Sequence, residues 1–284
     1  MMKEAGLVLE GGGNRGIFTA GVLDYFMEQN LSLPYVVGVS AGACNAIDYV
    51  SNQRERTKLS MLNQKGEDEK KGLRYLLEKR SLIDMDLIFD EFPKKQFPFD
   101  FETYFGSNIT CEIVATNCVT GKADYLSETE DRERLLAITR ASCSLPFVTP
   151  VVTVDDTPYL DGGVADPIPI RRSLLTGHKK NVIILTREAG YRKKRNGLHE
   201  RVSFLLYKDY PKFIASMQKR HFVYNKTLDL IERLEAEGRV FVIRPEKVLI
   251  GRTEKNNANM EAFYQQGYDI GKQSFEAMIE YLNK

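Results

Sequence analysis

The sequence of 284 residues lacks the features that mark several common classes of protein. Lysine and arginine total 40 against 39 aspartate and glutamate residues, so a net charge of +1 gives no global attraction to nucleic acid or anionic lipid. No stretch approaches the roughly 20 apolar residues that span a bilayer, and the first residues show no signal-peptide pattern. We therefore expect a cytoplasmic protein with no nucleic-acid partner, in which any membrane contact is local and peripheral.

Cysteine and metal-ligand patterns are also scarce. The chain has four cysteines, at Cys44, Cys111, Cys118 and Cys143. They show neither C-x-x-C spacing nor the density of a secreted disulfide scaffold, which indicates reduced thiols. The pair Asp155 and Asp156 lacks the alternating oxygen ligands of a calcium loop. We expect neither a metal nor another cofactor.

The chain has the composition of a globular protein, with 43% apolar and 28% charged residues. Predicted strands alternate with predicted helices, which favours an α/β fold with a mostly parallel sheet and helices on its faces. The predicted strands cover residues 5–10, 35–39, 109–117, 181–185 and 240–243, with a hairpin at 151–154 and 158–160. The predicted helices cover residues 16–30, 41–53, 128–142, 204–237 and 257–282.

We expect one compact domain over residues 1–284, because nothing reads as a long linker. Charged, helix-prone sequence at about 54–107 is predicted to be an insertion, and residues from about 203–284 a helical C-terminal extension. The helices predicted within the insertion lie at 65–71, 73–77 and 82–92.

Two weaker patterns raise the question of lipid contact. The aromatic stretch from Phe92 to Phe105 is better explained by core packing than by an acyl-chain pocket. The basic run at 192–195, with Arg201, is better explained as a solvated loop than as a site for lipid head groups. Neither pattern by itself predicts a site.

Three glycine-containing motifs each follow a predicted strand. Residues 11–16 read G-G-G-N-R-G, residues 38–42 read G-V-S-A-G, and residues 161–163 read D-G-G. In an open parallel sheet, ligands bind at the edge formed by the carboxyl ends of the strands. We therefore expect the three motifs to meet at that edge.

Ser40 is the candidate nucleophile. It lies between a short apolar strand and a predicted helix, which is the setting that a nucleophile elbow requires. The serine there adopts a strained backbone, and small neighbours such as Gly38 and Gly42 let the helix close against the sheet.

The loop at 11–16 fits two functions. Its G-x-G-x-x-G pattern occurs in dinucleotide-binding folds, but the next strand ends without the carboxylate that would hold the ribose, and no G-K-[ST] ending is present. The second function is an oxyanion hole, in which backbone N–H groups at a helix N-terminus stabilise a developing alkoxide. One such donor lowers the barrier by about 3 kcal/mol.

The base that activates the serine is not obvious from the sequence. A Ser-acid-His order would use Asp161 as the acid. The histidines that could complete this order are His178, His199 and His221. None follows a strand, and His178 precedes one, which places it across the sheet from Ser40. Asp161 does follow a strand, and Gly162 and Gly163 permit close backbone approach. The simplest assignment is a Ser40–Asp161 dyad with the carboxylate as base, and a histidine-assisted triad is the alternative.

The three motifs, in this order, resemble the patatin-like phospholipase family, whose pattern is G-G-G-x-[RK]-G, then G-x-S-x-G, then D-G-[GA]. The similarity spans at least residues 5–186, and 141–146 is similar to the family's Ser- and Pro-containing segment before the acid. Residues 244–252 are similar to a bacterial subgroup, which points to a bacterial host.

The resemblance implies a three-layer α/β/α patatin fold and lipid acyl hydrolysis by a Ser-Asp dyad without a catalytic histidine. Carried onto this chain, Ser40 is the nucleophile, Asp161 is the base, and Arg15 is the basic residue that holds the glycine loop. The oxyanion donors are then Gly11, Gly12, Gly13 and Ala41. The substrate is expected to be a lipid or other acyl ester. The alternative is a lipid- or acyl-binding protein with vestigial esterase activity.

Overall fold

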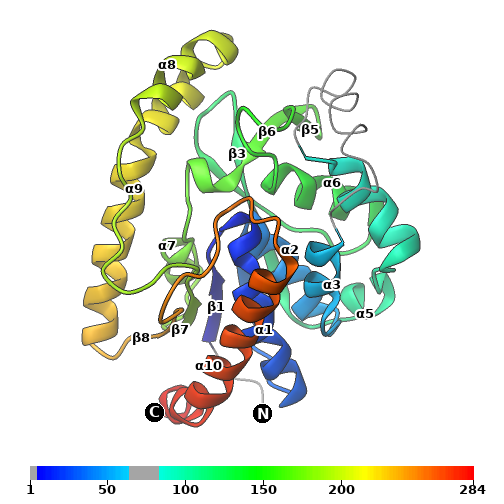
Figure 1. Ribbon diagram of the computed structural model, residues 1–284, viewed down its shortest axis with the longest axis vertical. Helices are drawn as coiled ribbons and strands as arrows, with labels where there is room; N and C mark the ends of the chain where they lie inside the picture. Colours follow the sequence, from blue (N-terminus) through cyan, green and yellow to red (C-terminus); the bar gives the residue numbers. More distant parts are fainter. Residues whose placement is uncertain (1–4, 64–82) are drawn as a thin grey trace.

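The computed structural model describes residues 5–63 and 83–284 (Figure 1). The predicted helices at 65–71 and 73–77, and the first residue of the one at 82–92, lie outside these ranges. A central sheet with helices on both faces makes up most of the described chain.

Within residues 5–63 and 83–284, the sheet has eight strands. They are β1 (Ala5–Leu9), β2 (Tyr35–Val39), β3 (Thr110–Asn117), β4 (Ala123–Leu126), β5 (Val152–Val154), β6 (Thr157–Asp161), β7 (Lys180–Ile184) and β8 (Val240–Ile243). Their order is β5-β6-β3-β2-β1-β7-β8, with β4 paired to β3. The neighbouring strands β3, β2, β1, β7 and β8 pair in parallel. Strands β4 and β6 each pair with β3 in the antiparallel sense, and β5 pairs with β6 in the antiparallel sense. The predicted mostly parallel sheet is confirmed.

Helices cover both faces of this sheet. The longer ones are α1 (Gly16–Glu28), α2 (Ala41–Val50), α6 (Arg132–Ser142), α8 (Gly197–Leu206), α9 (Pro211–Ala236) and α10 (Asn257–Asn283). The shorter ones are α3 (Arg56–Leu62), α5 (Phe101–Phe105), α7 (Ile170–Leu175), η1 (Gly13–Arg15), η2 (Leu87–Gln96) and η3 (Gly162–Val164).

Alternate residues of the central strands are buried against different helices. In β1, Leu7 and Leu9 belong to the core shared with α1, α2 and α10, whereas Val8 belongs to the core shared with α7 and α9. Strands covered on both faces carry continuous apolar runs, as β1 and β2 do. The predicted three-layer α/β/α arrangement is therefore confirmed, and Figure 1 shows α1 and α10 side by side with α9 running along the other side.

The structure differs from the sequence-based expectations in a few elements. The single helix predicted at 204–237 is wrong, because α8 ends before Pro211 and α9 begins at it. Proline lacks an N–H and restricts the residue before it, so a helix ends there and a new one starts. The helix predicted from residue 128 begins at Arg132, where the Asp131 side chain accepts the Arg134 N–H. The short strand β4 and helix α7 were not predicted.

Across residues 5–63 and 83–284, the helices lack the combination of length and apolar character that spanning a bilayer requires.

Candidate active site

Ser40 occupies a strained turn between β2 and α2. Its backbone angles are φ 57° and ψ −127°, a region that residues with a side chain rarely adopt. The turn depends on small neighbours, because a Cβ on Gly38 would collide with the backbone of Gly42. A Cβ on Gly42 would in turn lie 2.6 Å from the carbonyl oxygen of Leu9 in β1. The strand-turn-helix setting expected of a nucleophile elbow is present, with the serine 6% exposed.

The strand register brings the three motifs to one level of the sheet. Because Leu9 of β1 pairs with Gly38 of β2, Gly11 follows at the level of Ser40. The pairing of β2 with β3 places Ser40 beside Ala115, and Ala115 is the partner of Asp161. Asp161 reaches this level from the antiparallel strand β6, although the motif pattern pointed to an edge of parallel strands. The motifs meet as expected, but only two of them lie at the carboxyl ends of parallel strands.

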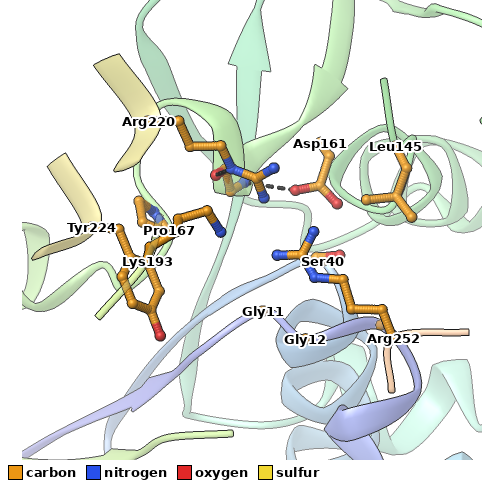
Figure 2. Close-up of a pocket in the computed structure, with 12 residues that line it drawn as sticks. Gly11, Gly12, Ser40, Leu145, Asp161, Pro167, Lys193, Arg220, Tyr224 and Arg252 are labelled. Atoms are coloured by element: carbon orange, nitrogen blue, oxygen red, sulfur yellow. Dashed lines mark hydrogen bonds between the residues drawn. The ribbon is translucent and has the colours of Figure 1, made fainter. Parts of the chain in front are cut away.

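Asp161 is buried, and only one of its two carboxylate oxygens accepts a hydrogen bond from the described residues. It is 1% exposed, and its Oδ1 accepts the N–H of Gly163 at 2.7 Å. Its Oδ2 is also buried and has no hydrogen-bond partner within the described part of the chain. Figure 2 shows this carboxylate above Ser40, and both residues line the same cavity. An unpartnered buried carboxylate oxygen is able to accept a proton from a group that enters this cavity.

The segment after α6 holds both Ser40 and Asp161 in place. The Ser142 hydroxyl accepts the Ser40 N–H at 2.9 Å and donates to the carbonyl of Val114 at 2.6 Å. The carbonyl of Ser144 accepts the Asp161 N–H at 2.7 Å. The sequence singled out residues 141–146 only by resemblance, and the hydrogen bonds give this segment a positioning role.

The glycine loop presents backbone N–H groups beside the elbow. The N–H groups of Gly12, Gly13 and Ala41 donate to no acceptor among the residues that the structure describes. The Gly11 N–H instead points to the carbonyl of Pro167, at 3.5 Å. A Cβ on Gly11 would lie 3.1 Å from the Cβ of Ser40, so this glycine allows the close approach of the loop to the elbow. Three of the four predicted oxyanion donors are therefore available to a ligand.

Arg15 lies beneath this loop. It is 3% exposed, and its Cβ would lie 3.2 Å from a Cβ on Gly12. The pKa of its guanidinium is lowered to about 10, mainly by burial and also by the nearby charges of Arg187 and Arg252, while Glu10 opposes them. Arg15 does not line the cavity, and its role in holding the loop stays a prediction.

The two histidines whose side chains the structure describes, His178 and His221, are not brought to the serine. His178 stacks on Tyr35 with ring centroids 4.2 Å apart, and Tyr35 begins β2 at the end opposite to Ser40. This is the side of the sheet predicted for His178. His221 lies on α9 and does not line the cavity, and the side chain of His199 is outside the described set.

The cavity contains residues that the sequence patterns missed. It measures about 360 Å³, counted to its open mouth, and is lined by Lys193, Arg220, Tyr224 and Arg252 in addition to the motif residues. Glu10 lies behind it, where its carboxylate accepts the Tyr224 hydroxyl at 2.7 Å and a backbone N–H at 2.6 Å. Lys193 belongs to the predicted basic run and Arg252 to the region of subgroup similarity, but neither pattern indicated that these side chains face the serine.

The remaining patterns have structural explanations. Arg192 of the basic run pairs with Asp229 and Glu232 on α9. The aromatic stretch packs on itself and the core, with Phe92, for example, 1% exposed, so the packing interpretation is confirmed. The Sγ atoms of Cys44 and Cys143 lie 3.6 Å apart as free thiols.

An elbow serine on a three-layer α/β/α sheet is the architecture of the α/β serine hydrolases as a class. Within that class, residues 7–174 match the family model described as patatin-like phospholipase. The chain therefore belongs to the patatin-like phospholipase family, which places it among lipid acyl hydrolases in general. Residues 210–283 match a second family model, a domain of unknown function (DUF6363).

One sequence relative and one solved structure illustrate the comparison. The uncharacterized protein YjjU of Escherichia coli (strain K12) is 29% identical over 248 residues, which cover 86% of this chain and 69% of YjjU. Among solved structures, the crystal structure of VipD from Legionella pneumophila matches with a TM-score of 0.47 and 12% identity. That match covers 96% of this chain and 67% of VipD.

Proposed function

We propose that the protein hydrolyses acyl esters of lipids through an acyl-enzyme on Ser40, with Asp161 as the proton acceptor. The observation that carries this proposal is the buried Oδ2 of Asp161, which has no partner within residues 5–63 and 83–284 and shares a cavity with the strained serine. A serine hydroxyl is a poor nucleophile until a neighbouring base takes its proton.

The reaction has two halves. Ser40 Oγ attacks the ester carbonyl while its proton moves to Asp161, and the carbonyl oxygen becomes an oxyanion held by the N–H groups of Gly12, Gly13 and Ala41. The tetrahedral intermediate collapses with loss of the alcohol, which takes the proton from Asp161. Water then attacks the acyl-enzyme with Asp161 again accepting a proton, and this proton returns to Ser40 Oγ as the fatty acid leaves.

A peripheral contact with a lipid surface is part of the proposal. Phe204, Leu205 and Leu206 at the end of α8 are 58%, 76% and 56% exposed, a run of large apolar side chains facing solvent. The next residue, Tyr207, accepts the backbone N–H of Phe147 through its hydroxyl at 2.9 Å, close in sequence to the cavity residue Leu145. Insertion of this run into a bilayer interface would bring lipid esters toward the mouth of the cavity.

The test combines turnover with active-site labelling. Wild-type protein should hydrolyse para-nitrophenyl butyrate and react with a fluorophosphonate probe, and Ser40→Ala should lose both signals. Asp161→Asn keeps an oxygen for the Gly163 N–H but removes the base, so kcat should fall by about 1,000-fold or more. Full activity in Ser40→Ala would contradict the proposal.

Two controls separate the alternatives. Individual alanine variants of His178, His199 and His221 should keep wild-type kcat, and a large loss in one of them would favour a histidine-assisted triad. A wild-type protein that binds lipid but neither turns over ester nor reacts with the probe would instead be a lipid-binding protein with vestigial chemistry.

A further inference from the structure

Three cationic side chains converge on the cavity beside the elbow. Lys193 comes from the loop before α8, Arg220 from α9, and Arg252 from the loop before α10. Figure 2 shows their nitrogen atoms directed into the space between Asp161 and the glycine loop. Lys193 lies outside both matched regions, and the two arginines lie in the matched region of unknown function, so none belongs to the patatin match.

Hydrogen bonds hold the positions of Lys193, Arg220 and Arg252 around the cavity. The Arg220 Nε donates to the carbonyl of Gly163 at 2.6 Å, which ties α9 to η3, the turn that directly follows Asp161. The carbonyl of Arg252 accepts the N–H of Asn14 at 3.0 Å, next to the glycine loop. The Asn225 side chain brackets the backbone of Lys193, with bonds of 2.8 and 3.1 Å. The positions of the three cations are therefore built into the fold.

None of the three side chains forms an ion pair within the described ranges, although the charge of Asp161 raises the pKa of Arg220 and that of Glu10 raises the pKa of Lys193. Within the described ranges, no carboxylate oxygen lies within 4 Å of a side-chain nitrogen of Lys193, Arg220 or Arg252, whereas Arg134 and Arg172 pair with carboxylates at 2.8 and 2.6 Å. The Glu10 carboxylate behind the cavity already accepts two hydrogen bonds.

The three side chains also repel one another, because each positive charge disfavours protonation of its neighbours. The pKa of Arg220 is lowered to about 10 and that of Lys193 to about 6, mainly by burial. The charge of Arg252 contributes to both shifts, and the charge of Arg220 contributes to that of Lys193. The groups that face Lys193 are Glu10, Arg15, Arg220, Arg252 and, with its ring 4.9 Å from the Lys193 ammonium, Tyr224. An anion in the cavity would relieve this repulsion.

We propose that Lys193, Arg220 and Arg252 form an anion subsite, which binds a phosphate or carboxylate group of the ester substrate next to the scissile bond. The inference deepens the proposed function and depends on it. A guanidinium presents a planar fork of donors that matches both phosphate and carboxylate, and Arg220 keeps its terminal nitrogens after its Nε is used by Gly163. The region at 210–283 thereby selects the substrate of the patatin region.

The test compares matched esters that differ in charge. One pair is para-nitrophenyl butyrate and the same ester carrying a ring carboxylate. The other is dihexanoylglycerol and dihexanoyl phosphatidic acid, which share their acyl chains. Wild-type protein should show the higher kcat/KM for the anionic member of at least one pair, and the pair that responds identifies carboxylate or phosphate as the recognised group.

Charge-removing variants then locate the subsite. Arg252→Gln and Lys193→Gln should lower kcat/KM for the anionic ester by about 10- to 100-fold each, the value of one charge-assisted hydrogen bond, and should lower kcat/KM for the neutral ester by a smaller factor. Arg252→Lys should recover part of the loss. Lys255→Gln and Lys194→Gln remove exposed charges from the same two loops and serve as matched controls. Arg220 is left intact because it also holds Gly163.

The outcomes separate this inference from the proposed function. Two results overturn the anion subsite while ester hydrolysis stands. One is an equal kcat/KM of wild-type protein for both members of each pair, and the other is an equal fall of kcat/KM for neutral and anionic esters in the variants. Absence of turnover and of fluorophosphonate labelling overturns the proposed function instead.

Binding to Ser40→Ala protein, measured by calorimetry, distinguishes the source of the anion. Dihexanoyl phosphatidic acid should bind at least about tenfold more tightly than inorganic phosphate, and Arg252→Gln should weaken both. Phosphate binding as tight as that of the lipid would make the site one for a free anion and overturn its role in substrate selection.

Discussion

The hydroxyl of Ser142 satisfies two buried backbone groups at once, one of them the N–H of the candidate nucleophile. It accepts the Ser40 N–H at 2.9 Å and donates to the carbonyl of Val114 at 2.6 Å, and the residue is fully buried. Ser142→Ala removes the partner that this hydroxyl provides to each of the two groups. Each lost partner costs about 1–3 kcal/mol, so the free energy of unfolding should fall by about 2–4 kcal/mol.

Ser144→Ala is a matched control two residues away. Ser144 is also fully buried, but its hydroxyl donates to the carbonyl of Arg140, which still accepts the Cys143 N–H at 3.1 Å after the change. The free energy of unfolding of Ser144→Ala should therefore fall by less than about 1 kcal/mol.

Thermal melting and ester kinetics check the two variants together. Ser142→Ala should lower Tm by about 5–10 °C, using the usual scaling for a chain of this size. It should also lower kcat by about 10- to 100-fold, because a nucleophile displaced by even about 1 Å loses this much. If Ser142→Ala and Ser144→Ala have the same Tm and the same kcat, the positioning role of Ser142 is refuted.

Three further predictions concern the elbow, the helix layer and the cavity. Gly42→Ala would place a Cβ 2.6 Å from a carbonyl oxygen of β1 and should destabilise the protein by at least about 2 kcal/mol in denaturant melts, whereas Gly251→Ala, with open space around it, should not. Burial raises the pKa of Asp24 to about 6 although the Tyr264 hydroxyl donates to it at 2.6 Å, so Tyr264→Phe should destabilise by about 1–3 kcal/mol at pH 7.5 and by less at pH 5, where this carboxyl is protonated. Equal losses at both pH values would show that the hydroxyl does not stabilise the ionised carboxylate. Because an anion raises the pKa of Lys193 from about 6, inhibition by sulfate should weaken by roughly tenfold between pH 6 and pH 8, and Lys193→Gln should flatten that dependence.

The contribution of residues 210–283 changes how the cavity is understood. Arg220 ties α9 to Gly163, and Arg252 contacts the glycine loop through its carbonyl. The C-terminal region is thus part of the wall around the candidate site, and its removal would expose the loop and the acid together.

The sequence by itself determined the parts of the site that depend on local conformation. The turn at Ser40 needs small residues at fixed offsets, and the loop at 11–16 needs bare backbone, so both leave a pattern in adjacent residues. The alternation of apolar strands with helices likewise predicted the α/β/α layers. Pro211 also indicates a helix boundary in the sequence. The prediction of one helix over 204–237 followed the apolar periodicity and ignored this proline, and it therefore missed the division into α8 and α9.

Only the tertiary structure decided how distant segments meet at the serine. The antiparallel direction of β6 follows from its pairing with β3, which no local pattern records, and it sets Asp161 level with Ser40. Lys193, Arg220 and Arg252 share a cavity because α9 packs on the sheet and the loop before α10 contacts the glycine loop. A side chain's local sequence gives its charge, but the direction it faces is fixed by packing over long sequence separations, so the cationic wall of this cavity is visible only in the folded chain.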